Sequence, residues 1–161
     1  MHDVFLGLGS NLGDREAMLR GAVDAIDNLP GTEVVAVSPL YETPPMGPQD
    51  QGSYLNAAAH IRTQLEPLEL VECLQQIEAA LGRAEPGRRK HWGPREIDID
   101  VLLYGDRVID EPNLSVPHAG MHERWFVLKP LVDIAPNMLH PVSGQTASQL
   151  LEQVQASEAI S

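Results

Sequence analysis

Two aspartates spaced two residues apart form the most distinctive chemical pattern in the sequence. Between positions 96 and 101 acidic side chains alternate with branched apolar ones, and this period of two predicts a half-buried β-strand. Asp98 and Asp100 therefore point the same way, with Cα atoms about 6.5 Å apart. Carboxylates at that spacing suit Mg²⁺, which proteins bind with a few carboxylates and substrate phosphates. An ordinary solvent-facing strand is the alternative, although Asp is depleted in strands.

A cluster of basic residues precedes this strand. Five of the eleven Lys and Arg residues fall within thirteen positions: Arg83, Arg88, Arg89, Lys90 and Arg95. Phosphoryl-type transfer relies on positioning and charge neutralisation, so it needs cations for the phosphates and carboxylates for a metal. The combined segment therefore predicts a phosphate-handling site; a solvated basic loop beside a plain strand is the competing interpretation.

Composition narrows the class of protein. A length of 161 residues predicts one domain, spanning 1–161, and a hydrophobic content of 43% is typical of globular proteins. The net charge of −12 argues against nucleic-acid and anionic-membrane partners and favours a monomer. Cys73 is the only cysteine, which excludes an internal disulfide and a Cys-based zinc site. Neither a signal peptide nor a stretch of about 20 apolar residues is present, so we expect a cytoplasmic protein.

Apolar periodicity and turn residues predict the elements that position these groups. Strands are expected at 3–9, 33–41, 54–61 and from 96, and residues 107–110 are expected to pair with the last of these as a hairpin. Helices are expected after Asp14, from Pro67, over 120–132, and after a capping box formed by Thr146 and Gln149. In the third strand Asn56 shares a face with Tyr54, and a buried amide there needs a hydrogen-bond partner.

The connection between the second and third strands contains no helix, which argues against an all-parallel sheet. We therefore predict an α+β sandwich with a mostly antiparallel sheet. The glycines at 7, 9 and 13 follow a strand and precede a helix, as in a dinucleotide-binding turn, but their spacing is one residue too long. A Gly-Lys-Ser/Thr phosphate loop is also absent.

Several longer motifs occur in a fixed order. They are Gly-Ser-Asn-Leu-Gly-Asp at 9–14, Tyr-Glu-Thr-Pro-Pro-Met-Gly-Pro-Gln-Asp-Gln at 41–51, Tyr-Leu-Asn-Ala-Ala at 54–58, Trp-Gly-Pro-Arg-Glu-Ile-Asp-Ile-Asp-Val-Leu-Leu-Tyr-Gly at 92–105, Val-Pro-His at 116–118 and Arg-Trp-Phe-Val-Leu-Lys-Pro-Leu at 124–131. With these motifs the sequence resembles the 6-hydroxymethyl-7,8-dihydropterin pyrophosphokinase family. The resemblance implies a ferredoxin-like α/β sandwich that transfers pyrophosphate from MgATP to the pterin hydroxymethyl group in folate biosynthesis, releasing AMP.

The resemblance also implies roles for individual residues on the nucleotide side. Asp98 and Asp100 would hold two Mg²⁺ ions, with Arg83 and Arg95 as further catalytic residues. Which carboxylate accepts the hydroxyl proton stays open. The implied ATP-binding residues are Gln75, Arg83, Trp92, Arg95, Val101, Ser115, His118 and Arg124.

On the pterin side the resemblance implies that the substrate lies between the rings of Tyr54 and Phe126. A flat heterocycle favours such stacking, and its amide-like edge needs matched donors and acceptors. The implied pterin-binding residues are Thr43, Pro44, Met46, Tyr54, Asn56 and Phe126, and Glu78 falls near the same substrates.

Some positions depart from the family pattern. Asn113 and Ala119 stand where family members often carry a basic and an aromatic residue, and Ser115 replaces a threonine. Eight residues separate Arg83 from Trp92, so the choice of Arg88 or Arg89 as a second phosphate-binding arginine stays open. Two other functions stay in view: an ADP-forming phosphotransferase, and a catalytically silent nucleotide- or pterin-binding protein.

Overall fold

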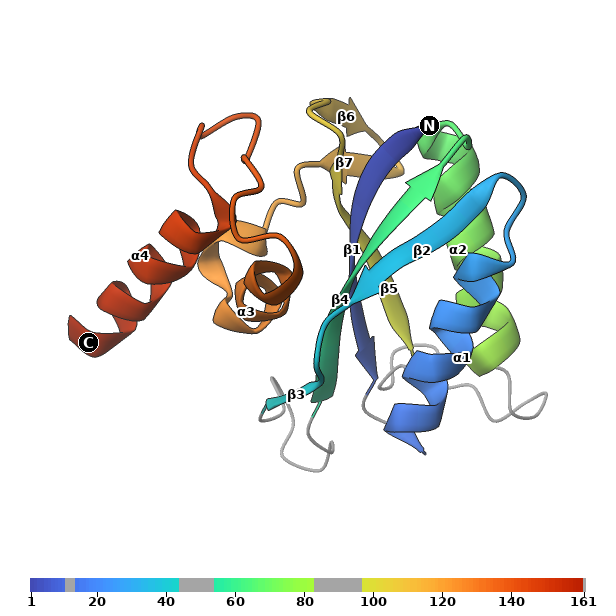
Figure 1. Cartoon of the computed structure of the whole chain (residues 1–161), viewed down its shortest axis with the longest axis horizontal. Coiled ribbons are helices and arrows are strands. Elements are labelled where there is room, and N and C mark those ends of the chain that lie inside the picture. Colours follow the sequence, from blue (N-terminus) through green and yellow to red (C-terminus); the bar gives the residue numbers. More distant parts are fainter. Residues whose placement is uncertain (11–13, 44–53, 83–96, 161) are drawn as a thin grey trace.

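The computed structural model describes residues 1–10, 14–43, 54–82 and 97–160. Within these ranges a five-stranded sheet is flanked by helices on both faces, as Figure 1 shows. No helix in the described part of the chain is long and apolar enough to cross a membrane.

The sheet and its first two helices follow a ferredoxin-like succession. In chain order the elements are β1 (His2–Ser10), α1 (Arg15–Asp27), β2 (Thr32–Val37), β4 (Tyr54–Thr63), α2 (Pro67–Gly82) and β5 (Asp98–Tyr104). The strands lie in the order β2-β4-β1-β5, and β1 pairs antiparallel with both of its neighbours. This β-α-β-β-α-β topology confirms the predicted fold class and excludes a dinucleotide-binding sheet, which would be parallel.

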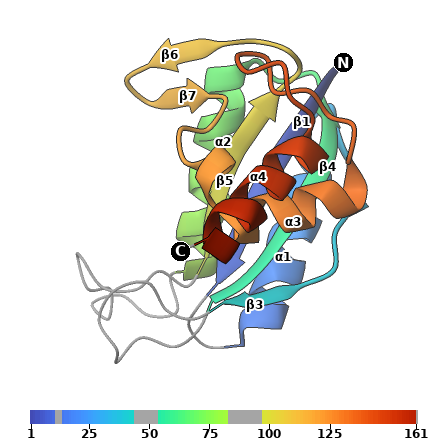
Figure 2. The same cartoon turned by 90° about the vertical axis from the view of Figure 1, so that its left-hand side faces the viewer.

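Two hydrophobic cores lie on opposite faces of the sheet. Helices α1 and α2 cover one face, α3 (Trp125–Ile134) lies on the other, and α4 (Ala147–Ile160) packs against α3 (Figures 1 and 2). Alternate residues of β1 explain the arrangement, because Val4, Leu6 and Leu8 enter the core under α1 and α2 whereas Phe5 enters the second core. Central strands buried on both faces are therefore apolar almost throughout.

The predicted second strand, 33–41, is interrupted. It consists of β2 and a separate β3 (Tyr41–Thr43), and both pair with β4. At the break, hydrogen bonds from Ser38 take the place of regular strand pairing with β4. The Ser38 Oγ accepts the N–H of Ala58 at 2.8 Å, and the Ser38 N–H donates to the Ala58 carbonyl. Pro39 follows and has no N–H to continue the pairing.

The predicted hairpin between residues 107–110 and the aspartate-containing strand is wrong. The segment forms β6 (Ile109–Glu111), which pairs with β7 (Leu114–Val116). A turn does occur after β5, where Gly105 has a φ of +54°. The outer edge of β5 instead contacts the segment that follows β7, where the Leu102 carbonyl accepts the N–H of His118 at 2.9 Å.

The helix termini follow their capping residues. Asp14 accepts the N–H of Ala17 at the start of α1, and Thr146 and Gln149 form the predicted reciprocal capping box before α4. The helix expected over 120–132 is instead two elements, a 3₁₀ turn (Met121–Glu123) and α3. Arg124 separates them with an extended backbone, φ −123° and ψ 109°.

Candidate active site

The ends of strands β1, β3, β4 and β5 meet at one end of the sheet, the lower end in Figure 1. In the sheet register Gly9 of β1 lies opposite Asn56 of β4 on one side and opposite Asp98 of β5 on the other. Thr43 of β3 lies opposite Tyr54 at the start of β4. The antiparallel topology thus brings together residues that are up to 89 positions apart in the sequence, from Gly9 to Asp98.

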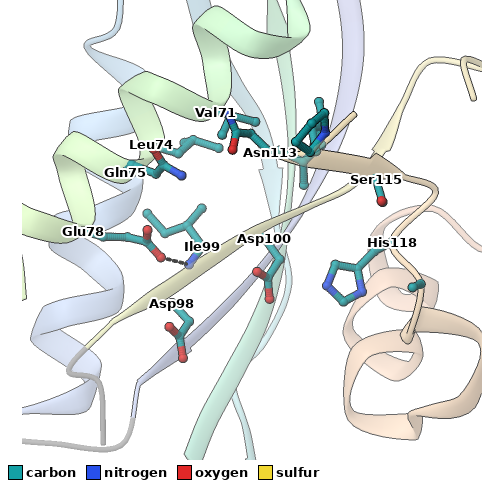
Figure 3. Close-up of a pocket in the computed structure, with 14 residues that line it drawn as sticks. Val71, Leu74, Gln75, Glu78, Asp98, Ile99, Asp100, Asn113, Ser115 and His118 are labelled. Atoms are coloured by element: carbon teal, nitrogen blue, oxygen red, sulfur yellow. Dashed lines mark hydrogen bonds between the residues drawn. The ribbon is translucent and has the colours of Figure 1, made fainter. Parts of the chain in front are cut away.

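Strand β5 has the two-faced character that its sequence predicts. Ile99 and Val101 are buried in the core under α1 and α2, whereas Asp98 is half-buried and Asp100 is exposed. The carboxylate of Glu78 on α2 accepts the backbone N–H of Ile99 at 2.8 Å, as the dashed line in Figure 3 marks. The strand therefore presents two carboxylates on one side while α2 binds its edge.

The larger cavity of the site, about 400 Å³ in volume, lies between α2, β5 and the segment around β7. Four predicted ATP-binding residues line it: Gln75, Val101, Ser115 and His118. Asn113 and Ala119, the two departures from the family pattern, line the same cavity. From α2 the apolar side chains of Val71 and Leu74 also line the space, together with the carboxylate of Glu78. Such a cavity has the size and mixed lining that a nucleotide requires.

His118 is oriented by its own backbone turn. Its Nδ1 accepts the N–H of Gly120 at 3.2 Å, so a neutral ring carries its proton on Nε2. The imidazole points toward the Asp100 side of the cavity in Figure 3. The geometry makes His118 a hydrogen-bond donor that suits an anionic group between it and the carboxylates.

A second cavity of about 310 Å³ lies on the α3 side of the same strand ends. Four predicted pterin-binding residues line it: Thr43, Tyr54, Asn56 and Phe126. Tyr54 belongs to β4 and Phe126 to the first turn of α3, so two aromatic rings come from different layers of the molecule. A planar ligand between them gains contact area on both faces.

Asn56 is fixed by hydrogen bonds. This buried amide donates through Nδ2 to Thr43 Oγ1 at 2.9 Å and to the Tyr41 carbonyl at 3.4 Å. The expectation that a buried asparagine must find a partner is confirmed. These bonds orient the amide group at the wall of the second cavity.

The two cavities meet at three shared residues. Asp98, Asp100 and His118 line both of them. A group held in one cavity and a group held in the other would therefore approach each other beside two carboxylates and a histidine. This is the geometry of a two-substrate transfer site, because proximity and charge control dominate such reactions.

Some predicted site residues lie elsewhere or outside the described ranges. Arg124, predicted to bind ATP, lines the second cavity and is absent from the lining of the larger one. The residues outside the described part of the chain are Pro44, Met46, Arg83, Trp92 and Arg95. The binding and catalytic roles of all these residues stay predictions.

Sequence reasoning missed Gly7 and Gly9 as site residues. Both lie within β1 and line the second cavity, where the absence of a side chain leaves room. A Cβ atom added to Gly9 would lie 3.4 Å from Asn56 Oδ1 and 3.7 Å from Tyr54 Cδ1. The available signal was glycine inside a strand pattern, which marks a close approach of a ligand or another backbone.

The carboxylates fit a magnesium ion that substrate phosphates help to bind. Among the residues that the structure describes, no group of three or more His, Cys, Asp or Glu side chains could hold a metal ion. Two aspartates on one strand face are instead the oxygen donor set that Mg²⁺ uses when phosphate and water complete its octahedron. The pair of carboxylates, Asp98 and Asp100, therefore suits a metal ion that binds together with a phosphorylated substrate.

Comparison with known proteins gives a consistent result. Residues 5–136 match the family model described as 7,8-dihydro-6-hydroxymethylpterin-pyrophosphokinase. The 2-amino-4-hydroxy-6-hydroxymethyldihydropteridine pyrophosphokinase of Methylorubrum extorquens is 47% identical over 157 residues, which cover 98% of this chain and 96% of the relative. The enzyme of the same name from Pseudomonas aeruginosa is 45% identical over 148 residues, covering 92% and 89%.

A solved structure shares the fold. The crystal structure of wild-type Plasmodium falciparum HPPK-DHPS with pteroate aligns with a TM-score of 0.76 at 16% identity. The alignment covers 94% of this chain and 44% of that longer one. From the family match and the close relatives, the chain belongs to the 7,8-dihydro-6-hydroxymethylpterin-pyrophosphokinase family.

Proposed function

We propose that the chain transfers the pyrophosphoryl group of ATP to the hydroxymethyl group of 6-hydroxymethyl-7,8-dihydropterin, giving the pterin diphosphate and AMP. The observation that carries this proposal is the meeting of two cavities at Asp98 and Asp100. Family membership supports the reaction, and this geometry supports the assignment of one substrate to each cavity.

The second cavity takes the pterin. Tyr54 and Phe126 supply two aromatic faces, and Asn56 supplies amide hydrogen-bonding groups at the wall. A flat ring bound there would direct its hydroxymethyl group toward the shared carboxylates. Pro44 and Met46 are proposed to complete this pocket.

The larger cavity takes ATP, with its phosphates directed toward Asp98, Asp100 and His118. His118 donates from Nε2 to a phosphate oxygen. Arg124, which lines the second cavity, neutralises the same phosphate charge from the pterin side. The adenosine portion lies toward Gln75, Val101 and Ser115. Arg83 and Arg95 are proposed to neutralise the phosphate charge as further catalytic residues, and Trp92 to close over the nucleotide.

Asp98 and Asp100 hold two Mg²⁺ ions in this proposal. When bound, the metal neutralises phosphate charge and orients the reacting oxygen and phosphorus. The two aspartates would supply the protein's oxygen ligands, and one of them would accept the hydroxyl proton. As the new bond from the hydroxymethyl oxygen to the β-phosphorus forms, the bond from the β-phosphorus to the oxygen that bridges to the α-phosphate breaks, and AMP leaves with that oxygen. The net charge of −12 supports action as a monomer, which sedimentation velocity would measure.

The identity of the nucleotide product tests the function. Purified protein is incubated with ATP, Mg²⁺ and 6-hydroxymethyl-7,8-dihydropterin, and nucleotides are separated by anion-exchange chromatography. We expect AMP that depends on the pterin, in equal amount to the pterin diphosphate. ADP would retain the metal site but overturn the reaction, and binding of both ligands without turnover would indicate a silent binding protein.

A further inference from the structure

Outside both cavities, three side chains connect β3 to α3. The hydroxyl of Tyr41 donates to Asp133 Oδ2, a contact between residues 92 positions apart. Lys129 Nζ donates to Asp133 Oδ1 at 3.3 Å and lies 6.0 Å from the centre of the Tyr41 ring. None of the three side chains lines either cavity. We call Tyr41, Lys129 and Asp133 the β3–α3 tie.

The strand end of the tie leads directly to the pterin pocket. Tyr41 and Thr43 belong to the same three-residue strand, and both accept hydrogen bonds from the Asn56 amide. Tyr41 lies opposite Asn56 and Thr43 opposite Tyr54 in the register with β4. A displacement of β3 would therefore disturb the amide and one aromatic ring together.

The helix end of the tie leads to the other aromatic ring. Asp133 follows Phe126 by seven residues, or about two turns, so both lie on the same face of α3. The helix is also anchored by Leu128 and Leu131, which are fully buried in the second core. Those apolar contacts are nondirectional. The tie adds a directional contact that fixes the rotation of α3 about its axis.

We propose that Tyr41 and Asp133 are positioning residues that set the spacing between Tyr54 and Phe126 in the pterin cavity. This inference rests on the proposed function, because it assumes that the pterin lies between those rings. The pair acts on pterin binding and not on ATP, since the larger cavity has no lining residue from β3 or α3.

The directions of the pKa shifts at Tyr41 and Lys129 agree with a hydrogen bond between Tyr41 and Asp133 in the folded protein. The hydrogen bond to Asp133 raises the pKa of Tyr41, and the same carboxylate raises the pKa of Lys129. The Asp133 side chain is 21% exposed, and the residue as a whole lies at the surface. The phenol therefore stays protonated, and able to donate, throughout the neutral pH range.

Steady-state kinetics of three single variants and one double variant test the inference. Tyr41→Phe removes the donor, and Asp133→Ala removes the acceptor. We expect each to raise the KM for the pterin by about fivefold, the scale of one lost hydrogen bond, with the KM for ATP unchanged. Asp133→Asn retains an oxygen acceptor, and we expect it to restore a pterin KM near that of the wild type. The double variant Tyr41→Phe/Asp133→Ala should be no worse than Asp133→Ala alone, because Asp133→Ala already removes the contact that Tyr41→Phe removes.

Tyr104→Phe is the matched control. The Tyr104 hydroxyl donates to the Leu65 carbonyl, and Tyr104 lies in the core under α1 and α2, outside both cavities. We expect this variant to lower the melting temperature without a selective change in the KM for the pterin. A merely structural role for Tyr41 and Asp133 would give the same pattern as this control.

The outcomes separate this inference from the proposed function. Wild-type protein that makes no pterin-dependent AMP would overturn the function itself. Active wild-type protein with an unchanged pterin KM in both Tyr41→Phe and Asp133→Ala would overturn only the positioning role. An equal rise in both KM values would do the same, because it would indicate general loosening.

Discussion

The side-chain carboxylate of Glu78 accepts the backbone N–H of Ile99, the residue between Asp98 and Asp100. This N–H points away from β1, so α2 supplies the acceptor that a further strand would otherwise provide. The bond fixes the part of β5 from which both carboxylates project. Glu78 thus connects the helix beside the larger cavity to the metal-binding aspartates of the proposed mechanism.

Two substitutions of Glu78 distinguish the effect of its hydrogen bond to Ile99 from the effect of its negative charge. Glu78→Gln retains an oxygen acceptor, and we expect turnover within about threefold of the wild type. Glu78→Ala leaves the Ile99 N–H without this acceptor, and we expect turnover to fall by about tenfold or more. Rates of AMP formation at saturating substrates measure both. Equal losses in the two variants would show that the negative charge of Glu78, and not its hydrogen bond, matters.

The two aspartates should be individually indispensable. Asp98→Asn and Asp100→Asn preserve side-chain shape but remove the anionic oxygen that a hard cation requires. We expect each to reduce turnover by about a thousandfold, with an unchanged melting temperature. Asp110→Asn, on the exposed face of β6, is a control for loss of one acidic charge. Near-normal activity in both active-site variants would contradict the metal assignment.

Gly9 should tolerate no side chain when the pterin is bound. A methyl group there would enter the second cavity between Asn56 and Tyr54, at 3.4 Å from the amide oxygen. We expect Gly9→Ala to raise the KM for the pterin and to leave the KM for ATP unchanged. Gly21→Ala, in α1 and outside both cavities, is the control for adding a methyl group. A pterin KM equal to that of the wild type would show that the ligand does not approach β1.

Local patterns predicted much of this molecule because they depend on neighbours in the sequence. Alternation around Asp98 and Asp100 gave the two faces of β5, and the Thr146 capping box gave the start of α4. The topology was also accessible, since a short connection between strands implies antiparallel pairing. The predicted hairpin failed because the choice of pairing partner depends on which strand edges tertiary contacts already use.

Contacts between distant residues had no local signal. The Glu78–Ile99 bond joins residues 21 apart and the Tyr41–Asp133 bond joins residues 92 apart. Each requires the sheet to be assembled before its partners meet. The same holds for the junction of the two cavities, because β5 and His118, two residues after β7, come together only in the folded chain.

Acid should weaken the loop that precedes α4. His140 Nδ1 accepts the N–H groups of Val142 and Ser143 at 3.3 and 3.1 Å, an arrangement that requires a neutral ring. Burial, and then the charge of His122, lower the pKa of His140 below its ordinary value of 6.5. A lowered pKa contributes stability that is present above pH 6.5 and is lost as the pH falls through the folded-state value.

The variant His140→Asn tests this linkage. An asparagine side-chain oxygen lies close to the position of Nδ1 and can accept the same N–H groups, but it does not titrate. We expect the melting temperature of the wild type to fall more than that of His140→Asn when the pH is lowered from about 7.5 to about 5. The His122 ring, whose centre lies 6.4 Å from that of His140, is retained in the variant, so the substitution removes the His140 imidazole together with its charge interaction with His122. Parallel curves for the two proteins would exclude His140 as the acid-sensitive group.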